Sequence, residues 1–105
     1  MPDKLLDAMD HVAIQVESIE RAVKWYTEHF NCEVAYQDES WALLQFENIK
    51  LAFVLPKQHP AHIGFRVSTD RIPAKLSTRR DGERTTYTRD SEGNMVEWLA
   101  PLEPV

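Results

Sequence analysis

The sequence contains little of what a disulfide-bonded, nucleic-acid-binding or membrane-spanning protein needs. Its only cysteine is Cys32, which excludes an internal disulfide and a cysteine-rich zinc site. Acidic residues outnumber basic ones by 17 to 12, and the net charge of −5 does not provide the basic stripe that phosphate binding requires. No apolar stretch approaches the roughly 20 residues of a membrane span. We therefore expect neither a nucleic-acid partner nor a membrane.

The first residues also lack the features of a secretory signal, which has an apolar core of roughly 7–15 residues. Here a single Leu5-Leu6 pair is surrounded by charged residues, namely Asp3, Lys4, Asp7 and Asp10. The lone cysteine suits a reducing compartment, so we expect a cytoplasmic protein. The length of 105 residues, with 43% hydrophobic residues, predicts a single domain over residues 1–105.

What the sequence does contain is an internal repeat. Residues 11–16 read His-Val-Ala-Ile-Gln-Val, and residues 62–67 read His-Ile-Gly-Phe-Arg-Val. Residues 51–56 and 96–101 form a second pair of largely apolar segments, and each ends in a proline. Two half-chains, about 9–56 and 61–101, therefore each begin with a histidine-led strand and end with an apolar strand.

Hydrophobic periodicity predicts the elements of each half. Alternation indicates strands at 11–16, 33–36, 41–46 and 49–55, and an amphipathic helix at 19–30 follows Ser18 as its N-cap. The second half is predicted to contain strands at 62–67, 84–88 and 95–99, with one or two helical turns at 72–76. The first half thus has the order strand, helix, strand, strand, strand. The second half is a shortened version of it.

Side-chain alternation also predicts a site. One face of each strand is apolar and can pack against a helix, while the opposite face carries the polar side chains. If the two half-sheets join edge to edge, that face becomes one concave surface with His11, Gln15, His62, Arg66 and Glu97. Two imidazoles and a carboxylate form a facial ligand set that suits divalent Fe, Mn, Ni or Zn and leaves open positions. The alternative is a pair of hydrogen-bonded histidines without a metal.

Three further residues are candidates for substrate binding. Arg66 could bind a carboxylate or phosphate of the substrate, or it could simply neutralise Glu97. Gln15 is expected to be a polar lining residue rather than a ligand, and Trp41 could line the pocket or belong to the core. His59, in the linker between the two halves, is expected to be a solvent-exposed residue.

Three segments carry a resemblance to a known superfamily. They read "DHVAIQVESIERAVKWYTEHFNCEV" (10–34), "HIGFRV" (62–67) and "DSEGNMVEWLAP" (90–101). The chain resembles the vicinal-oxygen-chelate superfamily, which includes glyoxalase I, fosfomycin-resistance proteins, extradiol dioxygenases, methylmalonyl-CoA epimerase and bleomycin-resistance proteins. The resemblance implies an α+β fold, in which two βαβββ modules, the second one shortened, form a curved mixed sheet around a concave metal site. It also implies that a second subunit often completes the cup, and the exposed sheet edges favour a homodimer.

The resemblance extends to the ligands. Up to four ligands come from the first and last strands of the two modules, and His11, His62 and Glu97 match three of them. The fourth position falls on Ala52, which cannot bind a metal. Because the metal-bound glutamate of glyoxalase I also serves as a base, Ala52 argues against plain glyoxalase chemistry.

Two functions of different classes follow. The first is a small metal-dependent enzyme acting on a small oxygenated substrate, with glyoxalase-, fosfomycin-resistance- or dioxygenase-like chemistry. Its metal would hold two substrate oxygens and stabilise an enolate-like or oxyanion intermediate. The alternative is a metal-free small-molecule binding or sequestering protein of the bleomycin-resistance type, motivated by Ala52 and the shortened second half. A weaker third reading is a sheet used only for protein contacts.

Overall fold

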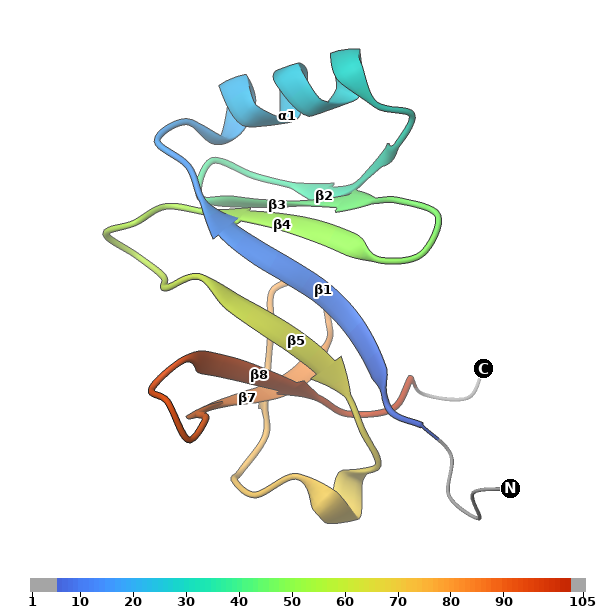
Figure 1. The fold of residues 1–105 in the computed structure, drawn as a ribbon, viewed down its shortest axis with the longest axis vertical. Coiled ribbons are helices and arrows are strands. Elements are labelled where there is room, and N and C mark those ends of the chain that lie inside the picture. Colours follow the sequence, from blue (N-terminus) through green and yellow to red (C-terminus); the bar gives the residue numbers. More distant parts are fainter. Residues whose placement is uncertain (1–5, 103–105) are drawn as a thin grey trace.

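The computed structural model of the chain describes residues 6–102, which form eight strands and one α-helix (Figure 1). Asp3, Lys4 and Leu5, on which the argument against a signal peptide partly rests, lie outside the described residues. In chain order the elements are β1 (Ala8–Gln15), α1 (Ile19–His29), β2 (Glu33–Gln37), β3 (Trp41–Gln45), β4 (Lys50–Val54), β5 (His62–Arg66), the 3₁₀ turn η1 (Thr69–Arg71), β6 (Ser77–Thr78), β7 (Arg84–Arg89) and β8 (Met95–Leu99).

The eight strands form one curled mixed sheet in the order β2-β3-β4-β1-β5-β8-β7-β6. In the first half β1 pairs with β4 in parallel, in the second half β5 pairs with β8 in parallel, and β1 and β5 join the halves as antiparallel neighbours. Ala52 lies two residues after the partner of His11, and Glu97 lies two residues after the partner of His62. The α+β fold of paired modules is confirmed, and Ala52 and Glu97 occupy equivalent positions in it.

The first half of the sheet is packed on both faces. Helix α1 begins after Ser18, whose Oγ accepts a hydrogen bond from the backbone N–H of Arg21 at 3.1 Å. The helix ends one residue earlier than predicted, and its apolar side covers the outer face of β3 and β4 (Figure 1). The buried residues between helix and sheet are Ile19, Val23, Ala42, Leu44 and Phe53. A second cluster on the concave face consists of Ala13, Trp41, Leu43, Ala52 and Val54.

The second half has lost its helix. The prediction of helical turns at 72–76 was wrong, because the only helical turn in this part of the described chain is η1, which ends before Pro73. A proline disfavours helical geometry in the residue before it and removes a backbone donor. The outer face of β5 and β8 therefore has no α-helix over it, and Ile63 is 38% exposed. Among the described residues, no helix has the length and apolar character needed to cross a membrane.

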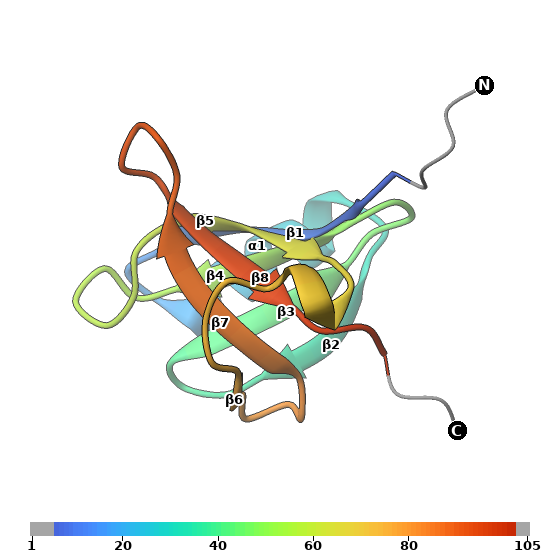
Figure 2. The same ribbon diagram turned by 90° about the horizontal axis from the view of Figure 1, so that it is seen from below.

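The sheet curls far enough for its two ends to meet. The segment between β6 and β7 reaches the turn between β2 and β3, where Arg80 Nη1 donates to Asp38 Oδ2 at 2.8 Å (Figure 2). The neighbouring Arg79 lies with its guanidinium carbon 5.3 Å from the centre of the Trp41 ring. These contacts close the concave face into a cup, and the three predicted ligands, His11, His62 and Glu97, lie on that face.

The different packing of the two halves gives a first prediction. Phe53 is fully buried under α1, with its ring 5.1 Å from that of Tyr26, so Phe53→Ala should lower the free energy of unfolding by about 3–5 kcal/mol. Ile63→Ala on the uncovered face should cost less than about 1 kcal/mol. Urea unfolding followed by circular dichroism compares the two variants. An equal loss for both would contradict the uncovered outer face.

Candidate metal centre

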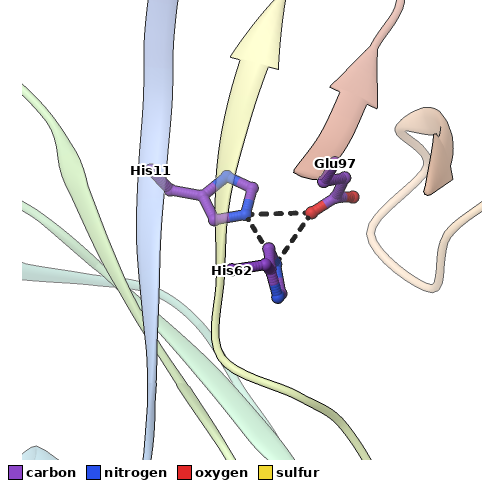
Figure 3. A group of neighbouring side chains, drawn as sticks. All are labelled: His11, His62 and Glu97. Atoms are coloured by element: carbon purple, nitrogen blue, oxygen red, sulfur yellow. Dashed lines mark hydrogen bonds and ion pairs between the residues drawn. The ribbon is translucent and has the colours of Figure 1, made fainter. Parts of the chain in front are cut away.

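Three buried side chains from three neighbouring strands meet on the concave face (Figure 3). His11 comes from β1, His62 from β5 and Glu97 from β8. The two Nε2 atoms are 3.2 Å apart, and Glu97 Oε1 lies 2.9 Å from His11 Nε2 and 3.1 Å from His62 Nε2. The structure therefore brings together the three residues that the sequence predicts as metal ligands.

Each imidazole is oriented by an acceptor behind it. His11 Nδ1 lies 2.8 Å from Asp10 Oδ2, and His62 Nδ1 lies 3.0 Å from the carbonyl oxygen of Pro60. Because a carboxylate and a carbonyl only accept hydrogen bonds, each Nδ1 carries the ring hydrogen. The neutral rings then direct the lone pairs of both Nε2 atoms towards each other and towards Glu97 Oε1. Three acceptors so close together need a cation, or an added proton, between them.

A divalent ion fits this arrangement. Bonds of about 2.0–2.2 Å to nitrogen and oxygen place neighbouring ligand atoms about 3.0–3.5 Å apart in octahedral or tetrahedral coordination. The three observed separations of 2.9–3.2 Å are close to that range. Ala52 lines the same cavity but offers no donor atom, so positions on its side of the site are left for water or a substrate.

Glu97 presents one oxygen to the histidines because Arg79 engages the other. Arg79 Nη1 donates to Glu97 Oε2 at 2.8 Å, while its Nε and Nη2 donate to Asp81 at 2.9 and 2.7 Å. Burial raises the pKa of Glu97, but the hydrogen bonds that His11 and His62 donate when their Nε2 atoms are protonated, together with the charge of Arg79, hold that pKa well below its usual range. Glu97 is therefore an ionised carboxylate in a buried position.

Asp10 is a functional residue that the sequence analysis missed. Regular alternation turns residue 10 away from the face of His11, but the pairing of β1 with β5 shifts register between Met9 and His11. Asp10 Oδ1 accepts from Lys50 Nζ at 3.1 Å and from Arg66 Nη2 at 2.9 Å. Burial raises the pKa of Asp10, but its hydrogen bonds with His11, Lys50 and Arg66 keep that pKa far below its ordinary value. The acidic residue directly before a candidate ligand was the available signal.

Two predicted substrate-binding residues do not line the cavity. Arg66 lies behind His11, where its Nη1 donates to the carbonyl oxygen of Ala100 at 2.6 Å and to Glu83 at 3.1 Å. Gln15, at the exposed end of β1, donates from Nε2 to the backbone carbonyl of His59 at 3.0 Å. Ion pairs and hydrogen bonds at the strand ends hold both side chains elsewhere. Neither residue therefore joins the three predicted ligands in the lining of the cavity.

A cavity of about 180 Å³ opens beside the three residues, a volume of about six water molecules. Trp41, 8% exposed, lines it together with Leu43, Ala52 and Val54. The polar part of its wall is formed by His11, Ser40, Gln58, His59, His62, Arg79, Arg80, Tyr87 and Glu97.

His59 also differs from its sequence expectation as a solvent-exposed residue. It is half-buried at the cavity, and its Nε2 lies 3.2 Å from the hydroxyl oxygen of Tyr87. Burial, followed by the nearby His62, lowers the pKa of His59. A linker residue has no periodicity that could have indicated this position.

A superfamily model described as Glyoxalase/Bleomycin resistance protein/Dioxygenase matches residues 8–98. The chain belongs to this superfamily. Among solved structures, this superfamily member is similar to hypothetical protein BH1468 from Bacillus halodurans C-125, with 16% identity, a TM-score of 0.76, and coverage of 94% of this chain and 97% of that one. It is also similar to methylmalonyl-CoA epimerase from Mycobacterium tuberculosis, with 18% identity, a TM-score of 0.72, and coverage of 98% and 93%. At these identities the similarity supports the fold alone. A search of curated proteins found no match.

Gly64 leaves the space that the His11 ring occupies. It lies opposite His11 in the pairing of β1 with β5, and a Cβ at this position would collide with the imidazole. The ring cannot easily move aside, because Asp10 holds its Nδ1 and Glu97 and His62 face its Nε2. The observed position of the His11 ring therefore requires a glycine here.

This requirement gives a second prediction. Gly64→Ala should lower the free energy of unfolding by about 1–3 kcal/mol through overpacking. The same substitution in a His11→Ala background, where the ring is absent, should be nearly neutral. The free energies of unfolding are measured by chemical denaturation for the wild type, both single variants and the double variant. Together they form a double-mutant cycle. Additive losses in that cycle would show that the collision with His11 is not the cause.

Proposed function

We propose that this protein is a small metal-dependent enzyme that acts on a small oxygenated substrate. The observation that carries the proposal is the meeting of three acceptor atoms, His11 Nε2, His62 Nε2 and Glu97 Oε1, with no hydrogen among them when the rings are neutral. These atoms would hold a divalent ion, with Fe, Mn, Ni and Zn as the candidates. Such an ion supplies a Lewis acid that polarises the oxygens of a bound substrate.

The residues around the centre have separate tasks under this proposal. Asp10 fixes the ring orientation of His11, and Arg79 keeps Glu97 ionised with one oxygen free. The apolar side chains of Leu43 and Ala52 exclude water from one side of the cavity and strengthen the electrostatic interactions there. Because Ala52 supplies neither a ligand nor a base, fosfomycin-resistance-like or dioxygenase-like chemistry fits the site better than plain glyoxalase chemistry.

A metal-free binding or sequestering protein is the second candidate, and one observation favours it. Burial lowers the pKa of His11, but hydrogen bonds with Asp10 and Glu97 raise it above its ordinary value overall. A protonated His11 would satisfy Glu97 without any metal, and Arg79 already balances the carboxylate. The cavity beside Trp41 would then bind a small molecule and turn over nothing.

A homodimer and a cytoplasmic location stay predictions. The feature that favours a second subunit is the outer face of the second half, which no α-helix covers within the described chain. Met9 on β1 and Ile63 on β5 are exposed there by 48% and 38%. An apolar surface of this kind is a common site of subunit contact.

Metal content tests the proposed function directly. Protein purified without a metal-affinity tag should contain about one metal ion per chain, measured by plasma mass spectrometry, or should take up one ion on incubation with Fe(II), Mn(II), Ni(II) or Zn(II). A His11→Ala, His62→Ala double variant should lose this ion, because two of its three ligands are gone. His29→Ala, which removes an exposed histidine on α1, is the matched control. No uptake under any of these conditions would favour the metal-free binding protein.

The role of Asp10 gives a separate prediction. Asp10→Asn keeps the size of the side chain but removes the charge that fixes the Nδ1–H form of His11. Loss of such a carboxylate behind a histidine ligand typically weakens metal binding by about 10–100-fold. Competition with a metal-binding dye measures the affinity, and Asp7→Asn, which alters an exposed pairing with Arg71, serves as the control. An unchanged affinity in Asp10→Asn would contradict the positioning role.

A further inference from the structure

We infer that the cavity takes substrates bearing a carboxylate at the end opposite their metal-binding oxygens, and that Arg80 recognises this carboxylate. The inference rests on the proposed metal centre and adds the chemical class of its substrate. It is carried by the charges that line the cavity and by the hydrogen bonds of the two arginines at its wall.

The wall of the cavity carries two arginines and one carboxylate, while Asp81 and Asp38 pair with those arginines from outside the wall. Among the residues that line it, Arg79 and Arg80 are cations and Glu97 is the only carboxylate, whereas the whole sequence has a net charge of −5. A divalent ion at the centre would add two further positive charges. Apolar walls such as Leu43 and Val54 reduce screening, so the charge of a bound divalent ion would act strongly on an anion that enters.

Only one of the two arginines has a complete pair of nitrogens free, because every nitrogen of Arg79 already donates a hydrogen bond. Arg79 uses Nε and Nη2 on Asp81 and Nη1 on Glu97. Arg80 uses Nη1 on Asp38 and Ser40, at 2.8 and 2.9 Å, and within residues 6–102 no hydrogen bond engages its Nε or Nη2. A guanidinium binds a carboxylate best through two parallel N–H groups, and the Nε–Nη2 edge of Arg80 is such a pair.

Arg80 is held at the mouth of the cavity before any ligand arrives. Its side chain is 57% exposed, and its guanidinium carbon lies 5.4 Å from the centre of the Trp41 ring that lines the cavity. Asp38, which anchors it, is itself fixed by the backbone N–H groups of Ser40 and Trp41 at 2.8 and 3.0 Å. A donor edge that is already placed loses little conformational entropy when it binds an anion.

The size of the cavity limits the distance between the two ends of the substrate. A volume of about 180 Å³ accommodates a short carbon chain, with one end at the His11, His62 and Glu97 centre and the other at the exposed Arg80. Two compounds test the interaction of the distal end of the substrate with Arg80 separately from metal binding. The compound 2-oxoglutarate and its analogue 2-oxopentanoate share the same 2-oxo acid group and chain length, and they differ only in the distal carboxylate.

The experiment measures the dissociation constants of both compounds for the Co(II)-loaded protein by calorimetry. The wild type should bind 2-oxoglutarate about fivefold tighter than 2-oxopentanoate, as expected for a partly exposed ion pair. Arg80→Gln should remove this preference and leave the affinity for 2-oxopentanoate unchanged. Arg80→Lys should keep part of it, because the charge remains without the paired N–H groups. Arg71→Gln, an exposed arginine on η1, should keep all of it.

The outcomes separate this inference from the function on which it rests. Equal affinities of the loaded wild type for the two compounds, or a preference that persists in Arg80→Gln, would overturn the inference and leave the metal centre intact. Failure of the wild type to take up Co(II) or any other divalent ion would overturn the proposed function and, with it, a metal-anchored substrate. Thermal unfolding of each variant establishes that it is folded before its dissociation constants are compared.

Discussion

The antiparallel pairing of β1 with β5 joins the two halves of the sheet, and its register determines whether the three side chains of the candidate metal centre meet. The pairing sets His11 opposite Gly64 and Ala13 opposite His62, so that the two imidazoles approach each other across the smallest side chains available. A slip of one residue would turn His11 towards the outer face. The parallel pairing of β5 with β8 then places Glu97 on the other side of Gly64. Two strand pairings thus account for all three side chains of the centre.

The same pairings create an electrostatic problem that the surrounding residues solve. Buried carboxylates are costly unless they are paired, and this structure buries Glu97 completely and Asp10 in large part. Each carboxylate receives a cation from a different direction: Arg79 reaches Glu97 from the segment after β6, and Arg66 reaches Asp10 from β5. Both arginines come from the second half of the chain, and Lys50 from the first half also donates to Asp10. Arg66 thus serves the site through Asp10 without lining the cavity.

The repeat was sufficient to predict the paired modules, and strand alternation was sufficient to predict that His11, His62 and Glu97 share a face. Alternation holds only within regular strands, however. At bulges, strand ends and linkers it did not predict which groups a side chain contacts. The register shift beside Asp10, the strand ends at Gln15 and Arg66, and the linker at His59 are all such places. The positions of Arg79 and Arg80 depend on how far the sheet curls, which is a property of the whole fold and not of any local pattern.

The two halves of the molecule differ in how they are packed and in the residues that they place at equivalent positions. Ala52 and Glu97 occupy equivalent positions, but Ala52 lies in an apolar cluster with Trp41 and Leu43, whereas Glu97 lies within reach of Arg79. Ala52 therefore adds apolar surface to the wall of the cavity at the position where the second half supplies a carboxylate. The first half, with α1 and two packed faces, provides most of the buried core. The second half, thinner and without a helix, supplies the carboxylate and both arginines of the cavity. The first half thus provides most of the core and His11, and the second half provides His62 and most of the charged residues around the candidate centre.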